Sequence, residues 1–134
     1  MSSLGPNTTI RDVMTGTPHT VGRNQKLAVA HDLMRKHGLR HLPVLEAREL
    51  VGVISQRDLY FLEASNGIDQ RVDVVGEAMS GDVFQATPDD KLTDVARTMA
   101  ERRLGCAVVV EGREVIGIFT ATDALTLLAR MTAS

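Results

Sequence analysis

The chain has 134 residues, of which 43% are hydrophobic and 24% are charged, and its formal net charge is −2. These values are ordinary for a globular protein made of one domain or of two closely packed halves. Lys and Arg are scattered along the chain, which argues against nucleic-acid binding, and no apolar run approaches the roughly 20 residues of a membrane span. A single cysteine excludes an internal disulfide, and the first residues lack the apolar core of a signal peptide. We therefore expect a cytoplasmic protein.

The first half of the chain is predicted to contain strands and helices after a loose polar tail, residues 1–8. Apolar residues recur at helical spacing after Asn24, a suitable N-cap, and Gly38 is a suitable helix end. Two short apolar runs separated by a charged turn indicate a hairpin of buried strands. The predicted elements are, in chain order, an edge strand over residues 18–21, a helix over 25–37, strands over 41–45 and 50–54, and a helix over 56–64.

The second half repeats this order after a polar linker, residues 65–71. The run Thr87-Pro88-Asp89-Asp90 has the N-cap residue, the proline and the acid expected at a helix start. Arg102 and Arg103 suit the negative end of that helix's dipole. The predicted elements are an edge strand over residues 83–86, this helix, strands over 106–110 and 115–119, and a helix over 121–130.

The two halves are related by a constant offset, which is the signature of an internal duplication. Placing Met14 on Met79 gives an offset of 79 − 14 = 65 residues, and no gap is needed. The same offset aligns Leu27 with Leu92, Met34 with Met99, Gly52 with Gly117, and Asp58 with Asp123. We predict a mixed α/β (α+β) fold of two pseudo-symmetric βαββα units packed as one module, with a first repeat over residues 9–64 and a second over residues 72–131.

Each repeat contains the pattern Gly-x-x-Ser/Thr-x-x-Asp where its last strand meets its last helix. A phosphate at that helix N-terminus would meet unpaired backbone N–H groups, and Ser55 or Thr120 adds a hydroxyl. Asp58 and Asp123, one turn later, are acceptors suited to the two hydroxyls of a ribose. The same pattern also fits a capping box, and the sequence leaves both roles open.

Several motifs in this order resemble one known family. The repeats open with Asp12-Val13-Met14 and Glu77-Ala78-Met79, and the other motifs are His41-Leu42-Pro43-Val44, Gly52-Val53-Ile54-Ser55-Gln56-Arg57-Asp58 and Gly117-Ile118-Phe119-Thr120-Ala121-Thr122-Asp123. From about Ile10 to Arg130 the chain resembles a tandem pair of cystathionine-β-synthase (CBS) domains, often called a Bateman module. The resemblance implies a regulatory sensor that binds AMP, ADP, ATP or S-adenosylmethionine in the cleft between the repeats and passes the ligand state to an effector protein. It implies no required cofactor.

The resemblance assigns nucleotide-binding residues in both repeats. They are Thr20, Val21, His41, Pro43, Val44, Ser55, Arg57 and Asp58 in the first, and Gln85, Ala86, Val108, Thr120 and Asp123 in the second. In the first repeat Arg57 is a permanent cation and Pro43 a wall for adenine, whereas the second has Thr122 and Val108 at these positions. Its phosphate anchor would have to be Arg40, Arg102 or Arg103. We expect the first site to be the better nucleotide binder, and the second to take an adenosine-like ligand or none.

Two other classes of protein compete with this interpretation. An enzyme is disfavoured because the chain has no Walker-type loop and no G-x-S-x-G motif, and we expect no metal site because Gly38 interrupts the i, i+4 pair His37 and His41. A ligand-free dimerisation module is the alternative. The helices after the hairpins carry more apolar residues than one sheet face needs, which predicts a homodimer, and the resemblance implies a flat disc of four repeats. These residues are Leu59, Tyr60, Phe61, Leu62, Leu125, Leu127 and Leu128.

Overall fold

The computed structural model describes residues 4–132, and the chain divides into two compact units. The middle unit is Pro18–Val83, and the terminal unit combines the described residues up to Thr17 with those from Phe84 onward. We call residues 4–17 and residues 72–83 the opening segments of the two halves. Each opening segment belongs to the unit that holds the hairpin of the other half. Within residues 4–132, no helix is both long and apolar enough to cross a bilayer.

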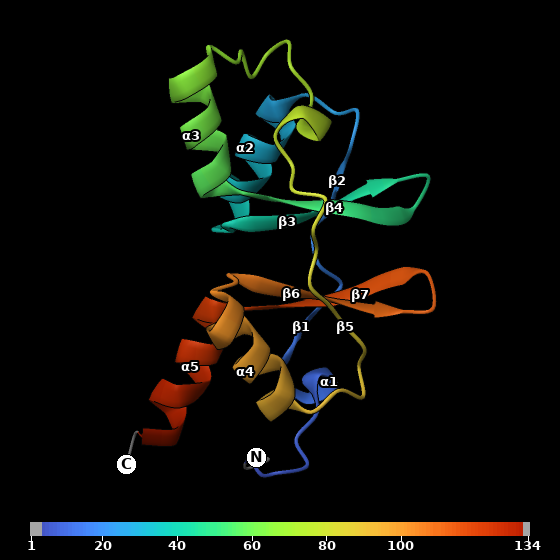
Figure 1. Ribbon diagram of the computed structural model, residues 1–134, viewed down its shortest axis with the longest axis vertical. Helices are drawn as coiled ribbons and strands as arrows, with labels where there is room; N and C mark the ends of the chain where they lie inside the picture. Colours follow the sequence, from blue (N-terminus) through green and yellow to red (C-terminus); the bar gives the residue numbers. More distant parts are fainter. Residues whose placement is uncertain (1–3, 133–134) are drawn as a thin grey trace. The chain divides into compact units, whose positions relative to one another are not determined.

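The middle unit is a three-stranded sheet with two helices on one face (Figure 1). Its sheet order is β2-β3-β4, with β2 parallel to β3 and β3 antiparallel to β4. Its elements are β2 (Val21–Gly22), α2 (Leu27–His37), β3 (His41–Glu46), β4 (Glu49–Ser55), α3 (Gln56–Asn66) and the short 3-10 helix η1 (Val75–Glu77).

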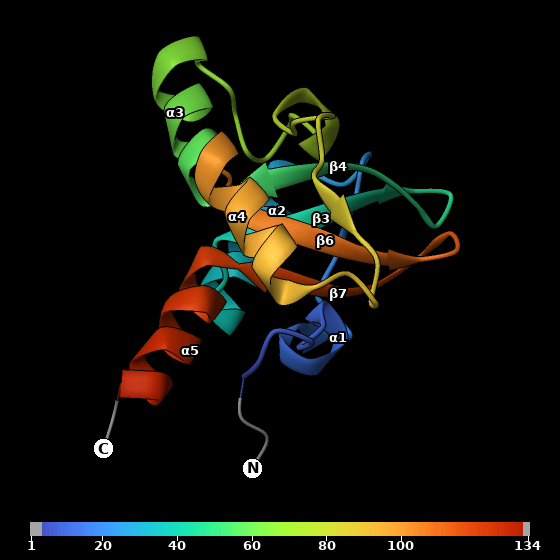
Figure 2. The same ribbon diagram turned by 60° about the horizontal axis from the view of Figure 1, so that its bottom comes forward.

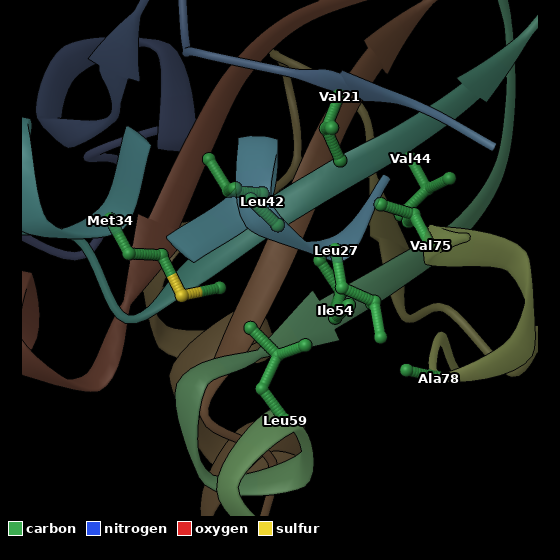
Figure 3. Packing of buried hydrophobic residues seen from close by; sticks show 10 residues of the cluster. Val21, Leu27, Met34, Leu42, Val44, Ile54, Leu59, Val75 and Ala78 are labelled. Carbon is green, nitrogen blue, oxygen red and sulfur yellow. The ribbon is translucent and has the colours of Figure 1, made fainter. Parts of the chain in front are cut away.

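Aliphatic side chains from the sheet and the helices form the core of the middle unit (Figure 3). Leu42 and Ile54 face Leu27 of α2 and Leu59 of α3, and all four are fully buried. Each such side chain stabilises the fold by about 1.5–3 kcal/mol through its removal from water. Val75 of η1 joins the same cluster, so the opening segment of the second repeat completes the core of the first hairpin.

The terminal unit has the same plan with one more strand (Figure 2). Its sheet order is β1-β7-β6-β5, with β5 parallel to β6 and the other neighbours antiparallel. Its core contains Phe119, Ile10, Val95 and Met99. Its elements are α1 (Ile10–Val13), β1 (Thr15–Gly16), β5 (Gln85–Ala86), α4 (Leu92–Arg102), β6 (Cys106–Glu111), β7 (Glu114–Thr120) and α5 (Ala121–Thr132). The structure confirms the predicted mixed α/β fold.

The predicted helix starts were wrong in both repeats. α2 begins after Lys26 and α4 after Lys91, and neither residue caps its helix with a side chain. Backbone carbonyls from the opening segments take that role. The amide of Leu27 donates to the carbonyl of Asp73, and the amide of Leu92 donates to that of Thr8, each at 2.9 Å.

The segments predicted as cap, tail and linker have other structures. The amide of Thr87 donates to Asp90 Oδ2 at 2.8 Å, so this run is a turn ahead of α4. Residues 1–3 of the predicted tail lie outside the described residues, and the amide of Thr8 donates to the carbonyl of Gly5 in a turn. In the predicted linker, α3 continues to Asn66 and ends at Gly67, which has a φ of 64°.

Each opening segment packs a methionine against a strand glycine. A Cβ on Gly117 would collide with Sδ of Met14, and a Cβ on Gly52 would lie 2.7 Å from both Sδ of Met79 and the backbone oxygen of Ser80. These positions therefore require glycine because another segment of the chain lies against the strand. The constant offset of the repeats, 117 − 52 = 65, appears here as the same contact in both units.

Alanine at either glycine should destabilise the protein, and removing the methionine should relieve the change at Gly117 more than the change at Gly52. We expect Gly52→Ala and Gly117→Ala each to lower the free energy of unfolding by about 1–3 kcal/mol through overpacking. Met14→Ala should offset part of the Gly117→Ala loss, because the nearest atom there is a flexible side chain. Met79→Ala should offset less of the Gly52→Ala loss, because the oxygen of Ser80 stays in place. Urea unfolding of the two double-mutant cycles measures the difference, and equal relief would contradict this account.

The ends of α2 and α4 offer a second pair of equivalent positions. Gly38 ends α2 with a φ of 65°, and Arg103, at the equivalent position, ends α4 with a φ of 56°. A side chain in this left-handed conformation costs about 1–2 kcal/mol, so Gly38→Ala should destabilise by about 1 kcal/mol and Arg103→Gly should stabilise by about 0.5–1 kcal/mol. Thermal unfolding of both variants tests the prediction, and a lower melting temperature for Arg103→Gly would overturn it.

Candidate functional site

Strand alternation places part of the predicted site on one face of the middle sheet. Leu42, Val44 and Ile54 point into the core with the helices, and successive side chains of a strand alternate between faces. The residues between them therefore point to the opposite face. His41 pairs in register with Ser55, and Pro43 pairs with Val53. Thr20 directly precedes the core residue Val21, so the same alternation brings Thr20 to this face.

The terminal unit repeats this arrangement with different residues. Gln85 pairs with Val108, and Cys106 pairs with Thr120. Ala107 and Val109 belong to the core, so Val108 and Cys106 point to the face away from the helices. Val108 is nevertheless 0% exposed, so its side chain offers a ligand little surface. The backbones of the two candidate sites are therefore equivalent.

Three predicted site residues lie on the core side of their sheets. Val21 is 2% exposed and Val44 is 0% exposed, and both pack among the aliphatic residues of the middle unit. Ala86 is 2% exposed in the core of the terminal unit. Their side chains support the strands that carry the site. At these three positions only backbone groups are left for contact with a ligand.

The two Ser/Thr-x-x-Asp motifs differ in their hydrogen bonds. In the terminal unit, the amide of Thr120 donates to Asp123 Oδ2 at 2.9 Å and the amide of Asp123 donates to Thr120 Oγ1 at 3.1 Å, which is a complete capping box. In the middle unit, the amide of Asp58 donates to Ser55 Oγ at 3.1 Å, but the carboxylate of Asp58 accepts no hydrogen bond from any residue of the described chain. The capping interpretation therefore holds fully for Asp123 and not for the carboxylate of Asp58.

The start of α3 offers fewer unpaired amides than the sequence led us to expect. The amide of Gln56 donates to the carbonyl of Arg40 at 2.9 Å, and the amide of Asp58 is bonded to Ser55. The amide of Ala121 makes the equivalent bond to the carbonyl of Gly105, also at 2.9 Å. Two of the first three amides of α3 are thus occupied, so an anion at this place depends mainly on side chains.

Charged side chains gather at one of the two sites only. The middle unit has Arg40, His41, Arg57 and Asp58 where the offset of 65 residues puts Gly105, Cys106, Thr122 and Asp123 in the terminal unit. Neither Arg40 nor Arg57 forms an ion pair with a residue in the described part of the chain, and both are exposed.

Burial sets the protonation of the two equivalent residues His41 and Cys106. Burial lowers the pKa of His41, nearby Asp58 raises this pKa, and Arg40 lowers it further. His41 is half-buried and therefore favours its neutral form. Burial raises the pKa of the Cys106 thiol to about 11, so this thiol is protonated and unreactive at neutral pH.

Arg40, a candidate phosphate anchor for the second site, lies in the middle unit. Its carbonyl accepts a hydrogen bond from the first amide of α3, and it directly precedes the strand that begins with His41. Of the other two candidates, Arg102 lies over the ring of Phe84 at 5.8 Å from its centroid, and Arg103 ends α4.

The histidines His37 and His41 do not come together. Gly38 ends α2 between them, and the ring of His37 stacks on that of His19 with centroids 3.8 Å apart. In residues 4–132, no group of three or more His, Cys, Asp or Glu side chains is arranged to hold a metal ion.

Comparison with known proteins matches both repeats to one family. The family model of the CBS domain matches residues 10–64 and 75–130. The chain is 29% identical over 114 residues to the CBS domain-containing protein YhcV of Bacillus subtilis, covering 85% of this chain and 81% of YhcV. It is also 34% identical over 115 residues to inosine-5'-monophosphate dehydrogenase of Korarchaeum cryptofilum, covering 85% of this chain but only 22% of that enzyme.

Two solved structures share the fold and contain adenosine compounds. The CBS domain pair of protein MJ0100, in complex with 5'-methylthioadenosine and S-adenosyl-L-methionine, has a TM-score of 0.85 and 28% identity, covering 95% of this chain and all of that one. CBSX2 in complex with AMP has a TM-score of 0.79 and 26% identity, covering 94% of this chain and 99% of that one. With two matched repeats and this shared fold, the chain belongs to the CBS domain family as a tandem pair.

Proposed function

We propose that this CBS pair is a regulatory module that binds an adenine nucleotide through the middle unit. The observation that carries the proposal is the carboxylate of Asp58 at the start of α3, which accepts no hydrogen bond from the described chain. Arg57 and Arg40, which form no ion pair with the described residues, come from the same helix start and from the residue whose carbonyl is bonded to it. A nucleotide presents ribose hydroxyls and a phosphate, which match a carboxylate and two guanidinium groups. The complexes of MJ0100 and CBSX2 with adenosine compounds support this ligand class.

Each residue of the site has a proposed role that follows from its place. Asp58 accepts hydrogen bonds from the ribose hydroxyls, and Arg57 and Arg40 bind the phosphate. Pro43 points to the same face as Thr20, but its side chain is fully buried, so it supports the strand and offers an adenine little surface. Val21 and Val44 contribute backbone groups only, because their side chains are buried in the core.

We propose that the site of the terminal unit is weaker. Gln85, Val108 and Thr120 offer no cation, and Asp123 is already bonded within its capping box. A ligand that recruits Asp123 must break a cap whose loss costs about 1 kcal/mol. An uncharged adenosine-like ligand, or none, fits this site best.

The output of the module is also a proposal. We propose that the ligand state of the middle unit is passed to a separate effector protein in the cytoplasm, without a required cofactor or catalytic step. In the relative inosine-5'-monophosphate dehydrogenase, the matching segment is only 22% of the enzyme. This supports the view that a CBS pair accompanies another activity and does not carry it out itself.

The same substitution at the two aspartates should affect different properties, namely AMP affinity at Asp58 and stability at Asp123. We expect Asp58→Ala to weaken AMP binding about 10- to 100-fold, because a charge-assisted hydrogen bond contributes about 1.5–3 kcal/mol. Asp123→Ala should leave AMP affinity nearly unchanged but lower the free energy of unfolding by about 1 kcal/mol through loss of its cap. Calorimetric titration and urea unfolding measure both effects, and equal losses of affinity from both variants would contradict the assignment.

Exchange of one further pair provides a matched control. Arg57→Thr gives the middle unit the residue of the terminal unit, and Thr122→Arg makes the reverse change. The first should weaken AMP binding and leave adenosine binding nearly unchanged.

A thermal-shift screen tests whether the protein binds any adenine compound. A ligand at 100 times its dissociation constant stabilises a protein by about 2.7 kcal/mol, so such a screen detects binding readily. No shift with any adenine compound would favour a ligand-free interaction module.

The exposed apolar residues of the two last helices support a second proposal, a homodimer. Tyr60 and Phe61 on α3 are 57% and 67% exposed, and Leu125 and Leu128 on α5 are 65% and 54% exposed. Such residues favour burial against another surface, and we propose that a second copy of the chain covers them. Light scattering should give the mass of a dimer, and Phe61→Glu with Leu125→Glu should shift it to a monomer. If the wild-type protein is a monomer at about 100 µM, the proposed homodimer is wrong.

A further inference from the structure

His41 lies next to the group that caps the helix at the proposed phosphate end of the site. His41 and Ser55 are directly paired across β3 and β4, so their side chains stand on the same face about 4.5–5.5 Å apart at Cβ. Ser55 Oγ is bonded to the amide of Asp58, and the amide of Gln56 is bonded to the residue before His41. A phosphate near the start of α3 therefore comes within reach of the imidazole.

The charged groups that act on His41 lie at the start of α3 and in the segment between α2 and β3. Asp58 at the start of α3 favours the imidazolium, while Arg40, directly before β3, disfavours it, and Arg57 lies beside Asp58. β4 contributes the uncharged Ser55, and β2 has no titratable residue. The last turn of α2 carries Arg35, Lys36 and His37, of which His37 stacks on His19.

In the unliganded protein, the surroundings of His41 favour the neutral imidazole. Burial is the largest cause of its lowered pKa, and Arg40 acts in the same direction. A phosphate dianion reverses this balance, because an opposite charge within about 4–6 Å favours the protonated form. With two of the first three amides of α3 already bonded, a phosphate there depends mainly on the side chains of Arg40, Arg57 and His41.

We propose that nucleotide binding to the middle unit is coupled to the uptake of a proton by His41, so that the affinity for phosphate-bearing ligands rises as the pH falls. The proposal rests on the proposed nucleotide function and adds regulation of that site by pH. Its sign follows from linkage. A group that binds its proton more tightly in the complex strengthens binding at pH values below its pKa in the complex, and this gain is lost as the pH rises through that value.

The terminal unit lacks this coupling. Cys106 stands at the position of His41, and its thiol, with a pKa raised to about 11 by burial, does not titrate near neutral pH. Any proton uptake near neutral pH therefore reports on the middle unit. Proton-linked binding separates the two sites of the pair even if both take an adenosine compound.

Calorimetry measures the proposed proton directly. AMP is titrated into the wild-type protein and into His41→Gln at about pH 7.5, where the phosphate of AMP, with a second pKa near 6, is mostly a dianion. Each titration is repeated in two buffers of different ionisation enthalpy, because the slope of observed enthalpy against ionisation enthalpy counts the protons taken up. We expect a positive fraction of a proton for the wild type and about none for His41→Gln. The wild-type dissociation constant should rise about three- to tenfold from pH 6.5 to pH 8.

Two controls separate the possible failures. Adenosine, which has no phosphate, should bind without proton uptake, and an NMR titration of His41 in the wild type should show a higher pKa with AMP than without it. If AMP binds with no proton uptake, or if His41→Gln takes up as much as the wild type, the coupling is wrong and the proposed function stands. If AMP, ADP, ATP and adenosine all fail to bind the wild type, the proposed function itself is wrong. If His41→Gln does not fold, the NMR titration of the wild type decides.

Discussion

The register of the two hairpins is the constraint on which the rest of the structure depends. His41 lies opposite Ser55, and Cys106 lies opposite Thr120, so the first residue of one strand is beside the residue that directly precedes the following helix. The amides of Gln56 and Ala121 then bond to the carbonyls just before those strands, which ties each helix to its hairpin. A shift of one residue would turn the core residues Leu42 and Ile54 toward the other face, so burial of the core fixes the place of the site.

On this repeated backbone the two units have different chemistry. Among residues 4–132, the proposed first site has two arginines without an ion pair, a half-buried histidine, and a carboxylate that accepts no hydrogen bond. The second replaces the arginines and the histidine with uncharged residues and uses its carboxylate to cap α5. Duplication thus preserves the core contacts, which depend on shape and apolar area, while the opposite face of the sheet is free to differ.

The opening segment of each half stabilises the hairpin and helices of the other half. The first turns of α2 and α4 depend on carbonyls of Asp73 and Thr8, which belong to the opening segment of the other repeat. Met79 and Met14 from the same segments pack on the glycines of the facing hairpins. Neither hairpin with its helices is therefore complete without residues from the other half of the sequence. The cost of an unsatisfied helix terminus is thereby avoided without capping side chains.

The sequence alone determined the repeated order of strand, helix, hairpin and helix, and the duplication, because hydrophobic periodicity and a constant offset are properties of the chain itself. Its motifs carried the resemblance to the family, but nothing in them predicted the short elements α1, β1 and η1. The sequence also identified the difference between Arg57 and Thr122. The tertiary structure alone decided which opening segment joins which hairpin, since local propensity does not record a contact between residues such as Leu92 and Thr8. It also decided that Val21, Val44 and Ala86 face the core and that Arg40 precedes the strand beside the start of α3. Asp123 caps its helix, whereas the carboxylate of Asp58 accepts no hydrogen bond from the described chain. The Ser/Thr-x-x-Asp motif allows both states of the aspartate, and only side-chain geometry at each helix start selects between them.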